Sequence, residues 1–208
     1  GIAAHSSRDI LSNENYLYDN SLAGISFINT GNYGTVYGIE AEAKVLLYKE
    51  DNTASKKLTA GFNGSLLKSN QELDSQKVQK ETTYDVVFTN KNSGFTGASN
   101  YLLNLDLSFF QEWNNKESNF TGTIAYTLFS DRIYALGTND RGDLVDKSFG
   151  TLDLIAKLKL NKHLSSGLSL KNLTNPAINR VQENSNGDIN VLSYKRGSFI
   201  SLNINYTF

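Results

Sequence analysis

The sequence predicts an all-β fold in which about seven antiparallel strands form a segment of a larger up-and-down transmembrane β-barrel. Three observations support this prediction: a composition suited to strands, seven segments in which apolar and polar residues alternate, and connections that alternate between short and long. The 208 residues include 11 Tyr, 11 Phe and 16 Gly but only one Pro. Aromatic residues are enriched in strands, whereas Pro is depleted because it cannot donate to the hydrogen-bond ladder.

The C-terminal strand shows the alternation most clearly. From Ile200 to Phe208 the even-numbered residues are apolar or aromatic, whereas the odd-numbered residues from Ser201 to Thr207 are small and polar. Successive side chains of a strand point to opposite faces, so the pattern predicts one apolar and one polar face. We expect this closing strand to reach back to about 191. Seven segments in all show this period of two: 37–47, 58–66, 101–113, 120–128, 151–161, 164–170 and 198–208.

The connections between these segments differ in length in a regular way. Those near 49–56, 113–118 and 161–163 are short, whereas longer connections, rich in Asn, Asp, Ser, Gly and Lys, lie near 69–99, 135–149 and 174–190. Short turns at one end and long polar loops at the other are typical of an outer-membrane barrel, and a soluble sandwich has no reason for this asymmetry.

The N-terminal segment differs from the rest of the chain. Residues 1–22 show no sustained alternation, and we expect them to form an extracellular loop that leads into the first strand. That strand begins at Ala23 at the earliest, so residues 23–208 form the predicted barrel part.

The polar faces carry charged side chains well inside the predicted strands. A hydrated barrel lumen tolerates such charge, and so does the exposed face of a soluble sandwich. In a barrel these groups would contact a plug or a substrate, or would pair with one another across strands. The predicted lumen-facing wall residues are Glu40, Glu42, Lys44, Asp106, Glu112, Asp153, Lys157, Lys159, Asn203 and Asn205.

Aromatic residues lie at the ends of the apolar faces. Such side chains favour a membrane interface because one part is apolar and another can hydrogen-bond to water. A strand of about twelve residues, tilted by ~40°, spans roughly 30 Å, which matches a bilayer core and its flanking girdles. The predicted girdle consists of Tyr37, Tyr101, Trp113, Tyr194 and Tyr206.

The composition disfavours several functional classes. Lys and Arg number 20 against 21 Asp and Glu, so the net charge of -1 lacks the basic excess of a nucleic-acid-binding protein. Without Cys there is no disulfide and no thiolate metal site. The two His residues, His5 and His163, lie far apart, and no nucleophile elbow occurs. We therefore expect no enzyme activity, no catalytic or metal site and no cofactor; an outer-membrane protease or lipase is disfavoured on the same grounds.

Three features resemble bacterial outer-membrane proteins, and in particular TonB-dependent receptors. Tyr206 and the terminal Phe208 resemble the aromatic terminal-strand signature that the barrel-assembly machinery reads. The sequence Tyr-Gly-Ile-Glu-Ala-Glu at 37–42 resembles the Gly-Val/Ile-Glu-x-Glu strand of these receptors. The run at 167–176 is similar to their Asn-Leu-x-Asp/Asn segment in the penultimate strand. The order of these features agrees with the family, and the resemblance covers about 25–208.

The resemblance implies a function and a set of partners. Members of this family have a 22-stranded barrel, an N-terminal plug and a box that binds the TonB coupling protein, and they import siderophores, cobalamin, glycans or peptides. The sequence shows neither plug nor box, so we expect it to form the last third of such a receptor. Implied partners are outer-membrane lipid and lipopolysaccharide, the remaining strands and plug, TonB, the barrel-assembly machinery and a surface lipoprotein. The C-terminus is expected at the periplasmic side of the bacterial outer membrane.

Two other functional classes remain open from the sequence. A passive porin-like or structural outer-membrane barrel would show the same strands, and upstream sequence encoding a plug would distinguish it from a receptor. A soluble β-sandwich adhesin or carbohydrate-binding module would not depend on detergent. In each case the long loops would carry ligand contacts, since loops on a rigid scaffold often do. The loop ligand-contact candidates are Tyr84, Phe88, Phe95 and Tyr134.

Overall fold

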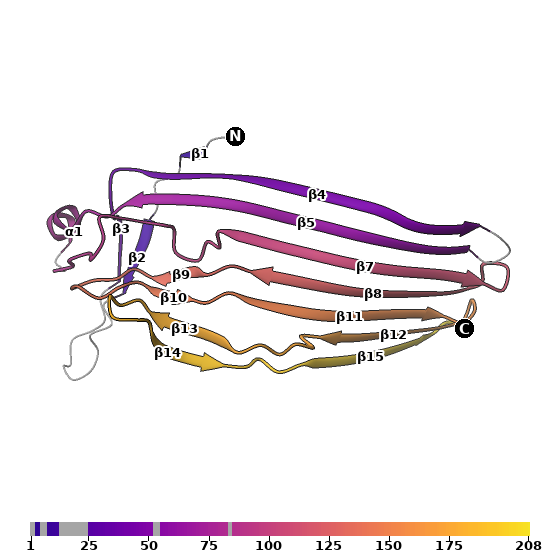
Figure 1. The fold of residues 1–208 in the computed structure, drawn as a ribbon. Helices are drawn as coiled ribbons and strands as arrows, with labels where there is room; N and C mark the ends of the chain where they lie inside the picture. Colours follow the sequence, from indigo (N-terminus) through magenta and orange to yellow (C-terminus); the bar gives the residue numbers. More distant parts are fainter. Residues whose placement is uncertain (1–2, 5–7, 13–24, 52–54, 83–84) are drawn as a thin grey trace.

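The computed structural model describes residues 3–4, 8–12, 25–51, 55–82 and 85–208, and most of them lie in antiparallel strands. The largest sheet contains seven long strands that pair with their neighbours in sequence order (Figure 1). The seven predicted segments are thus confirmed, although several strands are longer than expected. The strands are β4 (Gly34–Asp51), β5 (Ser55–Glu72), β7 (Tyr101–Trp113), β8 (Ser118–Phe129), β11 (Phe149–Lys159), β12 (Leu164–Lys171) and β15 (Phe199–Tyr206).

The register of the sheet keeps the two faces chemically distinct from strand to strand. Ala43 of β4 pairs with Phe62, which pairs with Leu105, and Leu105 pairs with Tyr126. The alternation in β4 breaks at Leu46-Leu47-Tyr48, where the register shifts by one residue. A β-bulge changes the parity of a strand, and here it returns Tyr48 to the apolar face opposite Leu58.

The sheet does not close into a barrel within the described residues. β15 pairs only with β12, and the outer edge of β4 pairs only with the two-residue strand β1 (Ala3–Ala4). A second two-residue strand, β6 (Asn92–Ser93), pairs with the end of β5. Most of the outer edge of β4 and the outer edge of β15 therefore have no strand partner in this part of the chain.

The short connections and the C-terminus lie at one end of the sheet (Figure 1). Residues 114–117 join β7 to β8, and residues 160–163 join β11 to β12. Asn114 and Asn115 adopt φ values of 53° and 51°, which Asn tolerates better than most residues. The backbone N–H of Thr207 donates to the carbonyl oxygen of His163 over 2.8 Å, which fixes the C-terminus beside a short turn.

The long connections at the other end contain elements that the sequence did not predict. A second sheet has the strand order β14-β13-β10-β9. Because β9 follows β8, β10 precedes β11, and β13 and β14 lie between β12 and β15, this sheet extends the hairpins of the large one (Figure 1). Its strands are β9 (Arg132–Ala135), β10 (Leu144–Asp146), β13 (Ile178–Gln182) and β14 (Ile189–Tyr194).

Two sequence predictions need correction here. The segment 191–208 is not one closing strand, because β14 ends at Tyr194 and β15 begins at Phe199, with Gly197 at a φ of 81° between them. The N-terminal segment 1–22, expected as a loop, contains β1 and one strand of a strand pair. That strand, β2 (Arg8–Ser12), pairs with β3 (Ile25–Asn29), which does not join the large sheet.

The buried apolar residues lie at the loop end of the molecule. Leu73, Val78 and Phe88 form a small cluster between β5 and the helix α1 (Ser75–Glu81), whose N-terminus is capped by Asp74. Val145, Ile178 and Val181 are buried in the second sheet. No apolar side chain of the seven long strands is buried. The large sheet therefore lacks a hydrophobic core of its own among the described residues.

No helix in the described part of the chain has the length and apolar character of a membrane span.

Candidate functional site

The ten predicted wall residues lie on one face of the large sheet. Lys44 pairs with Gly61, which pairs with Asp106, and through Ala125 the same row reaches Asp153. The parity of the strands places the other predicted wall residues on this face as well. We call this surface the polar face; its predicted members are Glu40, Glu42, Lys44, Asp106, Glu112, Asp153, Lys157, Lys159, Asn203 and Asn205.

Uncharged side chains on the polar face hydrogen-bond across strands. The Asn104 Nδ2 donates to Asn63 Oδ1 over 3.3 Å, and the Thr127 hydroxyl donates to Asn104 Oδ1 over 2.8 Å. The hydroxyls of Ser108 and Thr123 lie 2.7 Å apart and share a hydrogen bond. Such cross-strand pairs stabilise a sheet. The sequence did not identify them, because they depend on the register.

Most of the charged groups on this face are not paired with one another. Glu112 lies 3.9 Å from Lys116 of the adjacent turn, and Asp153 Oδ1 accepts the Asn172 N–H over 2.8 Å. Among the described residues, the other six charged members have no ion pair within 4.0 Å. The face therefore presents both signs of charge to water or to a partner.

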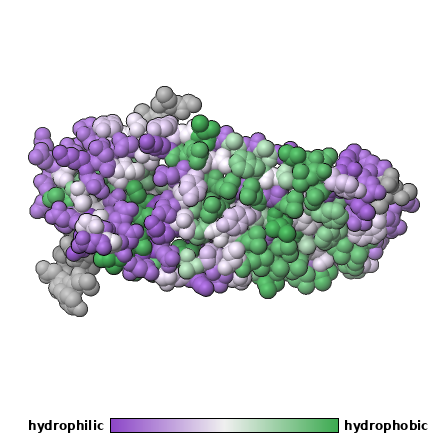
Figure 2. Space-filling model, in the orientation of Figure 1, coloured by the Kyte–Doolittle hydropathy of each residue, from purple (hydrophilic) through white to green (hydrophobic). Residues whose placement is uncertain are grey.

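The opposite face, which we call the apolar face, carries no charged residue across its middle rows. Its side chains are uncovered: Ile39 is 72% exposed, Ile200 76% and Ile204 67%. Figure 2 shows hydrophobic residues gathered over the long strands, with hydrophilic residues at the tip of the short turns and at the loop end. No second sheet packs on this face in the described part of the chain.

Aromatic residues border the apolar face at both ends. Tyr37 and Tyr101 lie towards the loops, whereas Trp113 and Tyr206 lie towards the short turns. The ring of Phe208 makes an edge-on contact with that of Tyr206, with centroids 5.1 Å apart.

The predicted aromatic girdle differs from the observed one at two residues. Tyr194 belongs to β14 of the second sheet, so it is not on the long closing strand as predicted. Tyr48 also borders the short-turn end of the apolar face. The bulge concealed it, because Tyr48 does not share the parity of Tyr37.

The loop aromatic residues differ from the prediction. Phe88 is only 8% exposed and packs with Leu73 and Val78, so its prediction as a stacking residue is wrong. Phe95 is half-buried. Tyr134 is exposed, but the guanidinium of Arg180 covers its ring at 3.1 Å from the centroid. Tyr84 lies outside the described residues.

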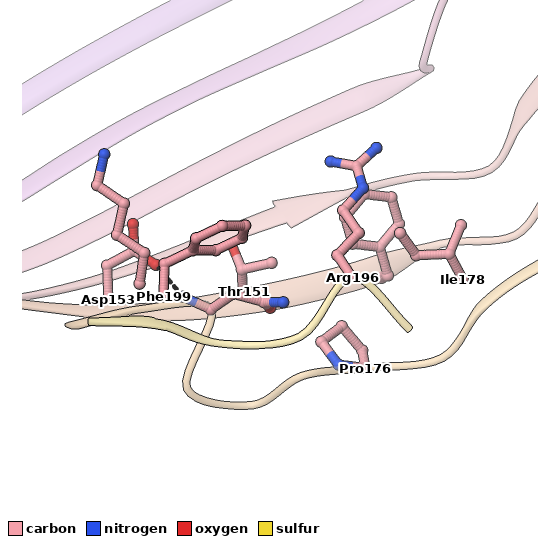
Figure 3. Close-up of a pocket in the computed structure, with 9 residues that line it drawn as sticks. Thr151, Asp153, Pro176, Ile178, Arg196 and Phe199 are labelled. Carbon is pink, nitrogen blue, oxygen red and sulfur yellow. Dashed lines mark hydrogen bonds between the residues drawn. The ribbon is translucent and has the colours of Figure 1, made fainter. Parts of the chain in front are cut away.

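A pocket of about 220 Å³ opens at the loop end of the polar face (Figure 3). It lies where β11, β12 and the segment before β15 meet, and no pattern in the sequence indicated it. It is lined by Phe149, Thr151, Asp153, Lys171, Asn172, Pro176, Ile178, Arg196 and Phe199.

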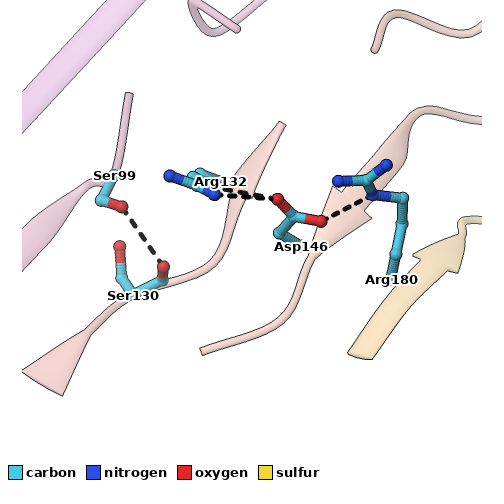
Figure 4. Close-up of polar contacts among 5 residues, drawn as sticks. All are labelled: Ser99, Ser130, Arg132, Asp146 and Arg180. Carbon is cyan, nitrogen blue, oxygen red and sulfur yellow. Dashed lines mark hydrogen bonds and ion pairs between the residues drawn. The ribbon is translucent and has the colours of Figure 1, made fainter. Parts of the chain in front are cut away.

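Asp146 lies at the centre of an ion-pair network in the second sheet (Figure 4). Arg132 donates to its Oδ2 through Nε and Nη2, both over 3.2 Å, and Arg180 Nε donates to its Oδ1 over 2.7 Å. The Asp146 side chain is 6% exposed. Burial alone would raise the pKa of Asp146, but the hydrogen bonds and charges of Arg180 and then Arg132 outweigh it and hold that pKa below its ordinary value.

Histidine and clustered acidic residues are sparse in the described part of the chain. Within these ranges, no group of three or more His, Asp or Glu side chains is arranged to hold a metal ion. His163 lies in a short turn, where its Nδ1 is 2.8 Å from the carbonyl oxygen of Thr207. The chemistry of this part of the molecule lies in its two contrasting faces and its loop-end pocket.

No protein-family model matches the chain, and no curated protein or solved structure is significantly similar to it.

Proposed function

We propose that the large sheet is part of the wall of a β-barrel in a bacterial outer membrane, and that the barrel belongs to a TonB-dependent receptor for active nutrient uptake. The observation that carries this proposal is the contrast between the faces: one is apolar, uncovered and free of charge across its middle rows, and the other is charged. Burying an exposed large apolar side chain contributes about 1.5–3 kcal/mol. Lipid on the apolar face would supply that burial, while water in a lumen would solvate the polar face.

The height of the apolar face fits a bilayer. Tyr37 and Tyr48 mark its two borders on β4, and Tyr101 and Trp113 mark them on β7. About eleven or twelve residues of tilted strand span roughly 30 Å, the thickness of a bilayer core.

The open edges of the sheet support a larger barrel. In lipid, each unpaired backbone group costs several kcal/mol, so an open edge is not stable there. We propose that further strands of the same receptor pair with β4 and β15. Seven strands alone would also make too narrow a barrel for a hydrated lumen, since about eight strands leave an interior that side chains fill.

The receptor class rests on the sequence resemblance and on the places of its three features. Gly-Ile-Glu lies in β4, the Asn-Leu pair follows β12, and the aromatic terminus follows β15 at the short-turn end. The proposed orientation places this end in the periplasm and the long loops outside. The proposed partners are lipid and lipopolysaccharide, a plug, TonB, the barrel-assembly machinery and a surface lipoprotein over the loops.

A passive porin-like barrel is the second candidate. The charged polar face favours it equally, because any hydrated pore wall tolerates such groups. The coding sequence upstream of Gly1 separates the two candidates. A receptor requires a plug and a TonB box there, and a reading frame without them would contradict the receptor assignment.

The membrane assignment is tested by fluorescence quenching in lipid vesicles. Trp113 is the only Trp in the chain, so a Trp113→Phe background leaves no tryptophan signal. In that background we expect brominated lipid to quench a tryptophan introduced by Leu107→Trp on the apolar face. The matched variant Ala125→Trp lies on the polar face of the adjacent strand and should be quenched by acrylamide instead. Equal quenching of both variants by brominated lipid would contradict the proposal.

A further inference from the structure

We infer that the pocket at the loop end of the polar face binds a small molecule that carries one carboxylate beside an aromatic or other apolar group. The pocket opens on the polar face, which is solvated whether or not lipid covers the other face. The inference therefore goes beyond the proposed function and does not depend on it.

Two cationic side chains supply the attraction for an anion. Lys171 ends β12 and Arg196 lies just before β15, and both line the pocket. Among the described residues, neither side chain has an ion pair or a hydrogen bond. Their solvent-exposed charges are available to a ligand, and hydrogen bonds between a cation and a carboxylate are stronger than neutral ones.

The charge balance favours a singly charged ligand. Asp153 also lines the pocket, but its Oδ1 already accepts the Asn172 N–H over 2.8 Å. Two cations against this one carboxylate leave a single positive charge in the pocket lining. A carboxylate matches that charge better than a phosphate dianion does.

An apolar surface lies beside these charges. Phe199 is 64% exposed on a face where the following β15 residues are Ser201, Asn203 and Asn205. Phe149 also lines the pocket, and its ring stacks on Phe129 with centroids 5.2 Å apart. Figure 3 shows Phe199 and Asp153 at one end of the pocket and Arg196, Pro176 and Ile178 at the other. A flat apolar group would gain contact with these side chains while its carboxylate meets the cations.

Hydrogen bonds hold the walls of the pocket in place before a ligand arrives. The Asn172 Nδ2 donates to the Gly197 carbonyl oxygen over 2.7 Å, and the Gly197 N–H donates to Asn175 Oδ1 over 3.0 Å. The Ser198 hydroxyl donates to the Asn172 carbonyl oxygen over 2.8 Å. These bonds join the segment that carries Arg196 to the end of β12, which reduces the entropy lost on binding.

The test compares benzoate, neutral benzamide and phenyl phosphate, titrated by ligand-observed NMR into the whole protein in a mild detergent. The pocket is small, so we expect benzoate to bind with a Kd of about 1 mM. We expect benzamide to bind at least about tenfold more weakly, because it lacks the charge. Equal binding of benzoate and benzamide, tighter binding of phenyl phosphate, or no benzoate binding would each overturn the inference in the wild-type chain.

Variants locate the binding site. Lys171→Gln and Arg196→Gln should each weaken benzoate binding about tenfold, because each removes one charge-assisted contact. The control Lys157→Gln removes the same charge from β11 on the same face, outside the pocket lining, and should change the Kd less than about twofold at moderate salt. Unchanged binding in both pocket variants would overturn the assignment of the ligand to this pocket.

Discussion

At the residue scale, Asp146 shows how a buried charge can organise the loops. It connects Arg132 of β9 to Arg180 of β13 from its own place in β10. Because the pKa of Asp146 is lower in the folded state, its contribution to stability is fully present above the ordinary aspartate pKa of about 3.9. That contribution is lost as the pH falls through the lower, folded pKa. The second sheet should therefore loosen in acid below about pH 4.

Asp146→Asn should destabilise the second sheet by about 1–3 kcal/mol, because it removes the charge between the two guanidinium groups. The measurement is hydrogen exchange of the β9, β10 and β13 amides, which should become faster while those of β7 and β8 do not. The matched control is Asp188→Asn, whose exposed carboxylate lies 3.9 Å from Lys147. An exposed pair of this kind contributes about 0–1 kcal/mol, so equal effects of the two variants would contradict the assigned role of Asp146.

A single charge introduced at Leu107 tests whether lipid contacts the apolar face. If lipid contacts this face, Leu107→Arg near the middle of β7 should lower the free energy of unfolding by about 2–4 kcal/mol. Ala125→Arg is the control, because Ala125 lies on the polar face between Asp106 and Asp153 and should accept a cation at little cost. Urea titration in lipid vesicles, followed by Trp113 fluorescence, measures both. A smaller loss for Leu107→Arg than for Ala125→Arg would exclude lipid contact at Leu107.

At the element scale, the long strands could be predicted because their period of two persists over seven or more residues. The ten wall residues followed from the same pattern, since each strand pairs with its neighbours without a change of parity except at the β4 bulge. The strands of the second sheet have three to six residues, too few for a period to be recognised. Helix α1 has seven residues, and Asp74 as its N-cap was the only local signal.

The parts of the site that the sequence did not predict depend on contacts between distant segments. The pocket joins β11 to residues on both sides of β13 and β14, so alternation within one strand cannot reveal it. Phe88 was predicted to stack on a ligand because it lies in a long loop, but it packs with Leu73 and Val78 instead. These outcomes reflect three-dimensional packing rather than local pattern.

Gly38 has a structural role in the pairing of β4 with β5. A Cβ at this position would lie 2.5 Å from the Leu66 carbonyl oxygen, which belongs to the backbone and cannot rotate away. Gly38→Ala should therefore destabilise the pair by about 1–3 kcal/mol, measured as a lower urea midpoint in lipid. In the control Gly61→Ala, the new methyl group meets the Asp106 carboxylate, which can move into solvent. We expect Gly61→Ala to lower the urea midpoint less than Gly38→Ala does. A larger effect of Gly61→Ala would show that β4 and β5 separate easily at Gly38.

At the scale of the whole molecule, the sheet has two unlike ends. The short turns and the C-terminus lie at one end, and the second sheet, the helix and the longer connections lie at the other (Figure 1). Long polar loops do not cross back through a bilayer once they are on one side, so a barrel that carries them at one end keeps a single orientation. The proposed orientation therefore places every short turn on the same, periplasmic side of the membrane.

Cysteine labelling tests this orientation, because the chain contains no Cys. Ser185→Cys places a thiol in an exposed loop between β13 and β14, and Lys162→Cys places one in the exposed turn between β11 and β12. In intact cells that express the whole protein, a membrane-impermeant maleimide of a size that the outer membrane excludes should label only the Ser185→Cys variant. Both variants should react after the cells are lysed, which shows that each thiol is accessible. Labelling of both in intact cells, or of Lys162→Cys alone, would rule out the proposed orientation, because a bilayer between the two ends must shield one of them.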